Sequence, residues 1–333
     1  MVSERPSRLI EKIRSAPELP LPAAPGLTFH CDGTTNPLVP AACTRGGLMD
    51  VHRPRGQGAA RPRQRRGDLV STVGNGGKVD DVRHIVMELG LGFSVDGGVA
   101  TGRADVFGEL CVPGATALRT SVLAIWADVV AGVLALNLTA PRPALTLDLD
   151  VQVVEPAEIG DTISLEARTV KAGRTVVVCE TRFRNETSGA LTAVCHTSFV
   201  TSPNPDHVFF HGALAGLPEG PFRLPVPLAE RAGSVIVAPG TIEVPRRADS
   251  LNTGGAIQGG LVALAAEEAA TSSAQGPTVL TSLGIRYLRP FSVGPARAVA
   301  DRHGEVCLVR LTDAGTGKLG AVATARLADA KPR

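Results

Sequence analysis

The sequence has few aromatic residues: Phe, Trp and Tyr together make up 3% of its 333 residues, with one Trp and one Tyr. Its core must therefore be built mainly from Val, Leu and Ala. Proteins that bind single-stranded nucleic acid stack bases on aromatic side chains, so this composition argues against that class. The formal net charge of +2 gives no reason to expect any other strongly polyanionic partner. We therefore expect no nucleic-acid partner.

The sequence also lacks closely spaced cysteines and a secretion signal. The six cysteines, none of them in a Cys-x-x-Cys pair, are Cys31, Cys43, Cys111, Cys179, Cys195 and Cys307. This spacing is typical of free thiols in a reducing compartment and does not fit a disulfide framework or a zinc ribbon. The N-terminus has no uninterrupted apolar core of the kind that signal peptides contain. We therefore expect a cytoplasmic protein.

One long apolar segment, Val122–Thr139, raises the question of a membrane span. Asp128 near its centre would cost about 2.5–3.5 kcal/mol on insertion scales, and no basic flank follows the positive-inside pattern. The overall content of 44% hydrophobic and 20% charged residues suits a soluble globular protein. We therefore expect a buried helix here and no membrane span.

Residues 1–80 differ in composition from the rest of the chain. They mix Pro, Gly and Arg without a helical or strand period, and we expect them to be largely disordered. The arginines within residues 53–66 are compatible with a tail that binds nucleic acid or a membrane surface, with a solvated tail, and with a wrongly assigned start codon. None of these alternatives sets the function.

The remainder of the chain repeats itself. The segments 145–161 and 280–295 are both alternating strands, and each ends in a Pro followed four residues later by a Gly. Pro156 and Gly160 thus correspond to Pro290 and Gly294, each 134 residues further on. In both halves two more strands joined at a Gly turn, and then a last strand, follow in the same order. We therefore predict two copies of one unit, at residues 82–202 and 226–330, joined by a linker at 203–225.

Each unit also has one helix ahead of these strands. The helices begin near Arg119 and Gln258, and each carries an acid nine residues later, Asp128 and Glu267. A shorter strand precedes each helix, at about residues 98–106 and 240–246. Each unit is thus predicted to contain a strand, a helix and several antiparallel strands, which is an α+β arrangement.

The entry to the second helix resembles that of a known family. Hotdog-fold acyl-CoA thioesterases of the phenylacetic-acid-pathway (PaaI-like) type have approximately the motif N-x-x-G-x-x-H-G-G-x-x-x-x-x-x-D. The residues at this spacing are Asn252, Gly255, Gln258, Gly259, Gly260 and Glu267. The resemblance implies a tandem (double) hotdog: two fused copies replace a homodimer, each long helix is wrapped by an antiparallel sheet, and the two sheets are continuous. It also implies an acyl-CoA substrate and further pairing of two chains as a homodimer.

The first unit departs further from this motif. Pro113 replaces the Asn, and Arg119, Thr120 and Ser121 replace His-Gly-Gly, while Asp128 keeps the acid. In hotdog dimers of this type, the glycine turn of one unit faces the acid on the helix of the other. The resemblance therefore implies two unlike composite sites in one chain.

Thioester hydrolysis gives such a pairing a physical reason. Negative charge develops on the carbonyl oxygen, and unpaired N–H groups at a helix N-terminus are placed to receive it. Glycine lets the substrate approach the backbone closely, and loss of one such donor costs about 10²–10³ in rate. A facing carboxylate acts as general base on water or attacks directly. Partial burial raises the pKa of that carboxylate toward the working pH.

Site one of the prediction combines Asp128 with the turn that starts the second helix. There the N–H of Gly259, next to Gly260, is the oxyanion donor, while Asn252 and Gln258 orient the reacting groups. We favour this site as the active one.

Site two combines Glu267 with the turn at Thr120. Thr271, one helical turn after Glu267, is expected to hold water or the carboxylate. Arg119 and the lost glycines narrow the approach to this site. The neighbouring Glu268 is expected to face solvent or the other unit, although an alignment shift of one residue would exchange the two glutamates.

The leading hypothesis is hydrolysis of an acyl-CoA to free acid and coenzyme A, with no metal and no redox cofactor. Arg286 and Arg289 either meet the phosphates of coenzyme A or face solvent. The missing His and the divergent first unit also leave open a non-catalytic acyl-CoA-binding or regulatory protein. An enoyl-CoA hydratase or dehydratase on this fold needs a paired acid and His, and neither helix has D-x-x-x-x-H.

Overall fold

The structure is a computed structural model that describes residues 83–208, 222–252 and 254–330. All of these belong to one compact unit. The prediction for residues 1–80, and that for most of the linker at 203–225, lie outside the described residues.

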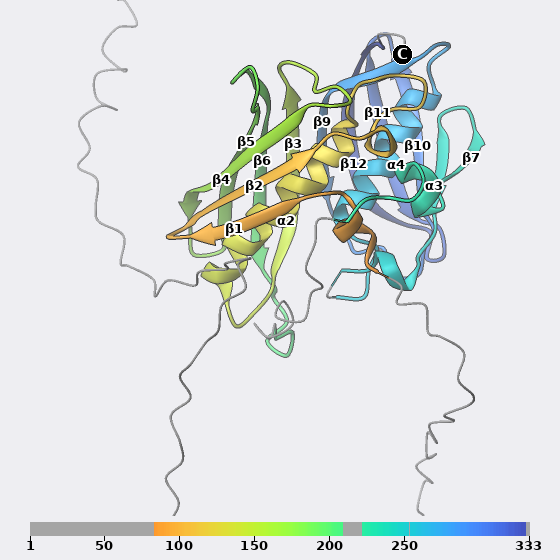
Figure 1. Cartoon of the computed structure of the whole chain (residues 1–333). Helices are drawn as coiled ribbons and strands as arrows, with labels where there is room; N and C mark the ends of the chain where they lie inside the picture. The colour runs from red at the N-terminus through yellow and green to blue at the C-terminus, as the bar shows by residue number, and fades with distance from the viewer. Residues whose placement is uncertain (1–82, 209–221, 253, 331–333) are drawn as a thin grey trace, which may run out of the picture. The chain divides into compact units, whose positions relative to one another are not determined.

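The described chain contains two long helices and a large antiparallel sheet (Figure 1). The α-helices are α2 (Thr120–Thr139), α3 (Leu228–Ala232) and α4 (Gly259–Ser272). Short 3-10 helices are η1 (Ile85–Glu88), η2 (Gly108–Leu110) and η4 (Ala248–Ser250). The strands are β1 (Gly92–Asp96), β2 (Val99–Asp105), β3 (Ala144–Val153), β4 (Thr162–Ala172), β5 (Val176–Asn185), β6 (Leu191–Thr201), β7 (Val235–Ala238), β8 (Thr241–Val244), β9 (Thr278–Tyr287), β10 (Ala296–His303), β11 (Val306–Asp313) and β12 (Lys318–Asp329).

The strands form one 12-stranded sheet with an internal two-fold pattern. Its order is β1-β2-β4-β5-β6-β3-β9-β12-β11-β10-β8-β7, so the second half repeats the first in reverse. The halves join where β3 runs antiparallel to β9, with Asp150 opposite Gly284. These two residues are 134 positions apart, which is the offset of the sequence repeat, so Asp150 pairs with its own equivalent. The predicted duplication and the continuity of the two sheets are therefore confirmed.

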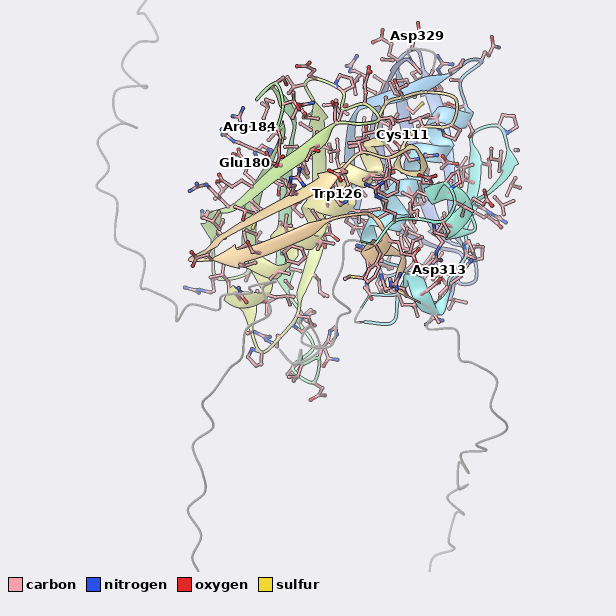
Figure 2. All side chains as sticks on the ribbon, viewed as in Figure 1. Cys111, Trp126, Glu180, Arg184, Asp313 and Asp329 are labelled. Carbon is pink, nitrogen blue, oxygen red and sulfur yellow. The ribbon has the colours of Figure 1, made fainter. Side chains whose placement is uncertain are left out.

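Alternation of side chains directs one face of the sheet toward the helices. On β5, Val177, Cys179 and Phe183 are buried. Glu180 and Arg184, which lie at alternate positions of the same strand, point away from the core (Figure 2). A period of two is what a half-buried strand requires. Both long helices lie on the buried face.

Helix α2 contains the predicted apolar segment and begins at Thr120, with Arg119 as its N-cap residue, close to the predicted start. It is long and apolar enough to cross a membrane, but 61% of its apolar window is buried within the fold. Trp126 on this helix is 1% exposed, lies under the strands in Figure 2, and donates from Nε1 to the carbonyl of Leu89 at 3.3 Å. Helix α2 therefore forms part of the core that both halves share.

The predicted turns and leading strands are also present. Gly160 and Gly294 both have positive φ, +95° and +74°, which favours glycine. Strands β2 and β8 occupy the two predicted leading positions. The edge strands β1 and β7 were not predicted, because β7 is exposed along its whole length and β1 buries only Val95, so neither shows an alternating pattern.

Candidate active site

Asp128 and Gln258 meet across the junction of the two repeats. Asp128 lies in the middle of α2 and Gln258 is the N-cap residue of α4. The side-chain Nε2 of Gln258 donates to Oδ2 of Asp128 at 3.2 Å. The predicted pairing of one repeat's acid with the other repeat's turn is therefore observed.

The environment of Asp128 favours proton uptake. Its other carboxylate oxygen accepts a hydrogen bond from Oγ1 of Thr146 on β3 at 2.9 Å. Burial raises the pKa of Asp128 to about 6, although the bond from Thr146 opposes this shift. The side chain is half-buried rather than sealed in. Asp128 thus has the properties of a general base near neutral pH.

The start of α4 presents two free backbone donors beside this carboxylate. Gln258 caps the helix by accepting from the N–H of Leu261 at 3.2 Å, and its own N–H donates to the carbonyl of Ser250 at 2.9 Å. Within the described residues, no acceptor takes a hydrogen bond from the N–H of Gly259 or Gly260. Such N–H groups carry the positive end of the helix dipole and attract developing negative charge.

Tyr287 and Cys195 also lie near Asp128 and the start of α4. Neither residue was predicted as part of the site. The hydroxyl of Tyr287, at the end of β9, donates to the carbonyl of Gly259 at 2.8 Å. Burial, with a smaller contribution from the negative charge of Asp128, raises the pKa of the Cys195 thiol to about 12. The pKa of Tyr287 lies well above its ordinary value because of burial, then Asp128 and Cys195. The inward register of β9 could have pointed to Tyr287, since it follows the inward-facing Ile285 by two residues.

Site two has the predicted composition but is closed by its own acid. Oε1 of Glu267 accepts from the N–H of Thr120 at 2.9 Å, and Oε2 accepts from the N–H of Ser121 at 3.4 Å and from its hydroxyl. Glu267 has no exposed surface, and burial raises its pKa although Arg119 and Ser121 oppose the shift. The N–H groups that would receive a substrate oxygen therefore already hold a carboxylate.

Arg119 closes site two from the other side. It is 1% exposed, and its Nη1 lies 2.6 Å from Oε1 of Glu268 and 3.6 Å from Oε2 of Glu267. Glu268 therefore faces the other repeat, which was one of the two predicted alternatives. Arg119 was predicted to narrow this site, and in the structure its guanidinium is buried there against both glutamates.

The two sites also differ at the residues on β3 and β9 that correspond to each other in the two repeats. The offset of 134 residues places Leu280 where site one has Thr146, and Val153 where site one has Tyr287. The hydroxyl of Thr120 donates to the carbonyl of Leu280 at 2.8 Å, so it too is already used. Only site one combines a hydrogen-bonded acid with free N–H groups.

Two residues predicted for the sites have other roles. Asn252 is exposed, and its Oδ1 accepts from the N–H groups of Gly254 and Ala256 at 2.9 and 3.1 Å, so it shapes the loop. The hydroxyl of Thr271 donates to the backbone carbonyls of Glu267 and Glu268 at 2.9 and 3.2 Å, and not to the Glu267 carboxylate. Both bonds are local side-chain to backbone bonds of the kind that these residue types favour.

The two glycines at the start of α4 also differ in role. A Cβ added to Gly260 would lie 2.2 Å from Cγ1 of Ile125 on α2, so this glycine allows the two helices to approach. A Cβ on Gly259 would meet only the ring of Tyr287 at 3.5 Å, which is an ordinary contact. Gly260 is therefore required by packing, whereas Gly259 is not.

Arg286 and Arg289, which were expected either to meet the phosphates of coenzyme A or to face solvent, are both exposed. Ile285 and Tyr287 face the helices, so Arg286 between them points to the outer face of the sheet, where it is exposed. There it borders a groove of about 620 Å³. Arg289 is exposed and its Nη1 donates to the carbonyl of Leu319 at 3.4 Å. This was the alternative in which both face solvent.

Among the described residues, no cluster of three or more His, Cys, Asp or Glu side chains is arranged as metal ligands. At site one the groups that could act chemically are the side chains of Asp128, Thr146 and Gln258 and the backbone amides at the start of α4.

Comparisons with known proteins bear on the fold. The model of the Thioesterase superfamily matches residues 120–192, which include Asp128 and Thr146. No match was found among curated proteins. The 12:0-ACP thioesterase from Umbellularia californica is 13% identical, with 72% of this chain and 99% of that chain covered and a TM-score of 0.51. At this identity the likeness shows the fold alone.

Two further structures are less similar. An acyl-ACP thioesterase from Bacteroides thetaiotaomicron is 11% identical, with 69% of this chain and 98% of that chain covered and a TM-score of 0.48. The PaaI protein of E. coli is 16% identical, with 37% of this chain and 84% of that chain covered and a TM-score of 0.33. The last score is too low to bear on the narrower PaaI-like type. The fold is that of hotdog thioesterases, as predicted, with two such units in the chain.

Proposed function

We propose that the protein is an acyl-CoA thioesterase with one active site per chain, formed by Asp128 of the first repeat and the start of α4 in the second. The observation that carries the proposal is the contrast between the two helix starts. The N–H groups of Gly259 and Gly260 are free beside an acid with a raised pKa, whereas those of Thr120 and Ser121 hold Glu267.

The proposed reaction is hydrolysis with Asp128 as general base. Asp128 takes a proton from a water molecule while the water oxygen adds to the thioester carbonyl. The negative charge that develops on the carbonyl oxygen is stabilised by the N–H groups of Gly259 and Gly260. The C–S bond then breaks, coenzyme A leaves as a thiolate that takes the proton held by Asp128, and the free acid and the ionised base remain.

Gln258 and Thr146 position the base for this step. Each donates one hydrogen bond to a different oxygen of Asp128, which fixes the plane of the carboxylate. Because carboxylate oxygens accept up to four bonds in total, these two leave lone pairs for water. The predicted roles of Gln258 and Gly259 therefore stay part of the proposal, while Asn252 is not needed for it.

The thiol carrier is proposed to be coenzyme A, as the motif implies. The Umbellularia californica and Bacteroides thetaiotaomicron structures carry the names of acyl-ACP thioesterases, so acyl-ACP is the competing carrier. Cys179, Cys195 and Cys307 are buried thiols that form no disulfide, which is compatible with the proposed cytoplasmic location, where either carrier would be met.

The test is release of free thiol from a panel of short, medium, long and aromatic acyl-CoAs, with acyl-ACPs as a second panel. We expect hydrolysis of at least one acyl-CoA, and loss of that activity in Asp128→Asn. Hydrolysis of acyl-ACP alone would replace the proposed carrier. Tight binding of acyl-CoA without release would instead support the non-catalytic binder, and hydration of an enoyl-CoA would support the hydratase.

A further inference from the structure

We propose that Tyr287 is a positioning residue of site one: its hydroxyl holds the first peptide of α4 so that the N–H of Gly260 stays directed at the thioester carbonyl. This role rests on the proposed function, and it concerns a residue that neither the motif nor the comparisons single out.

The hydrogen bond of Tyr287 acts on the peptide that carries one of the donors. The hydroxyl lies 2.8 Å from the carbonyl oxygen of Gly259. That carbonyl and the N–H of Gly260 belong to one planar trans peptide, so they point in opposite directions and turn together. Fixing the carbonyl of Gly259 therefore fixes the direction of the Gly260 N–H.

The start of α4 needs such a restraint more than most helix starts. Two consecutive glycines have no side chains to limit their backbone dihedral angles, and the first turn of a helix lacks intrahelical bonds to its own N–H groups. The Tyr287 ring also lies against Gly259, 3.5 Å from the position of an added Cβ. The ring and the hydroxyl together confine this peptide from one side.

Tyr287 is suited to donate and not to exchange its proton. Burial raises the pKa of Tyr287 well above its ordinary value, and the charges of Asp128 and Cys195, which lie near it, raise it further. The hydroxyl therefore remains protonated throughout the pH range in which Asp128 titrates. It acts through Gly259 rather than on the substrate.

The two helix starts are restrained by different means. At α2 the carboxylate of Glu267 binds the N–H groups of Thr120 and Ser121 and so occupies them. At α4 a hydroxyl binds a carbonyl oxygen, which restrains the same turn while leaving the N–H groups free. Val153 stands at the position of the first repeat that corresponds to Tyr287, so this second device exists only at site one.

The test is Tyr287→Phe, which keeps the ring and removes only the hydroxyl. A hydrogen bond contributes about 0.5–1.5 kcal/mol, so we expect kcat to fall about threefold to tenfold while KM is unchanged. The matched control is Thr278→Val on the same strand, which removes a buried hydroxyl that has no partner among the described residues. It should leave both constants unchanged. An unchanged kcat in Tyr287→Phe, or a change in KM alone, would overturn the positioning role.

A second readout does not depend on activity. Amide hydrogen exchange at Leu261 and Val262, whose N–H groups donate to the carbonyl of Gln258 in the same turn, should become faster in Tyr287→Phe by a similar factor, about threefold to tenfold, while exchange at Thr120 and Ser121 in the same molecule stays constant. Equal exchange at Leu261 and Val262 in both proteins would contradict the proposal even if the wild type hydrolyses no thioester. Absence of hydrolysis with faster exchange would instead reject the proposed function and keep Tyr287 as the restraint of this turn.

Discussion

Asp128 is an acid whose ionised form is disfavoured by its surroundings. Its pKa is raised from 3.8 to about 6 in the folded protein, chiefly by burial. A group whose pKa is raised in the folded state binds its proton more tightly there than in the unfolded state. The folded protein therefore becomes less stable as pH rises from the unfolded pKa toward the folded pKa. The base is thus maintained at a cost to stability, which is common at active sites.

This cost gives a prediction for Asp128→Asn. The variant side chain cannot ionise, so its free energy of unfolding, relative to wild type, should rise between about pH 4 and pH 6 and reach a plateau above that range. Because one pKa unit corresponds to 1.36 kcal/mol, the gain is at most about 3 kcal/mol. Urea unfolding at several pH values measures it. A difference that is constant with pH would show that the pKa of Asp128 is not raised.

The same residue sets the expected pH dependence of catalysis. If Asp128 is the general base, kcat/KM should rise with pH, bend near the pKa of about 6 and then stay constant. The rate of thiol release with one acyl-CoA across this range tests the expectation. A profile without this bend in an active wild type would assign the base to another group.

At the scale of elements, the two glycines that start α4 should respond differently to the same substitution. Gly259→Ala should fold normally, since its Cβ makes only an ordinary contact with Tyr287, but the methyl group would obstruct approach to the N–H groups. We expect a loss of tenfold or more in kcat/KM, given that loss of one oxyanion donor costs about 10²–10³. Full activity in this variant would remove Gly259 from the site.

Gly260→Ala is the matched counterpart. Its Cβ would lie 2.2 Å from Cγ1 of Ile125, so α2 and α4 would have to move apart. Overpacking of this kind costs about 1–3 kcal/mol of stability, which thermal unfolding detects. A stable Gly260→Ala protein would show that the contact between the two helices is looser than the structure indicates.

A substitution of Glu267 at site two complements the Asp128→Asn test at site one. Glu267→Gln weakens the buried hydrogen bonds to the N–H groups of Thr120 and Ser121, while Arg119 keeps its ion pair with Glu268, so the free energy of unfolding should fall by about 1–3 kcal/mol. Because Glu267 is not part of site one, turnover per folded molecule should stay close to that of the wild type. If Glu267→Gln abolished turnover while Asp128→Asn did not, the chemistry would belong to site two.

Much of the element level was predictable from the sequence, and the reasons are physical. Repetition fixed the strand order, and the acids nine residues after Arg119 and Gln258 located both sites. The state of site two was not predictable, because spacing does not show whether Glu267 faces a substrate or reaches the N–H groups of Thr120 and Ser121 itself. The part played by Tyr287 was not predicted, because the residues were taken from the motif without the in-and-out register of β9, which directs Tyr287 toward the helices and Arg286 to the outer face.

At the scale of the whole molecule, the proposal implies one ligand per chain. Titration of the protein with a non-hydrolysable acyl-CoA analogue should saturate at one equivalent, since site two holds its own carboxylate. Isothermal calorimetry gives this stoichiometry directly, and Asp128→Asn provides a form that can be titrated with the true substrate. Two equivalents with comparable affinity would show that Glu267 moves aside when ligand binds.

The pairing of Asp150 with Gly284 at the centre of the sheet marks the axis about which the two halves correspond. In a dimer of identical chains, any substitution appears on both sides of such an axis, so both sites must change together. A fused chain removes this constraint, because each half is encoded separately. One half can then carry Arg119, Thr120 and Ser121 where the motif has His-Gly-Gly, and these residues bind the glutamates of α4 and stabilise the fold. The other half keeps a helix start whose N–H groups are free. Fusion of the two halves in one chain therefore allows one half to stabilise the fold and the other to keep the open site. Two identical chains cannot differ in this way.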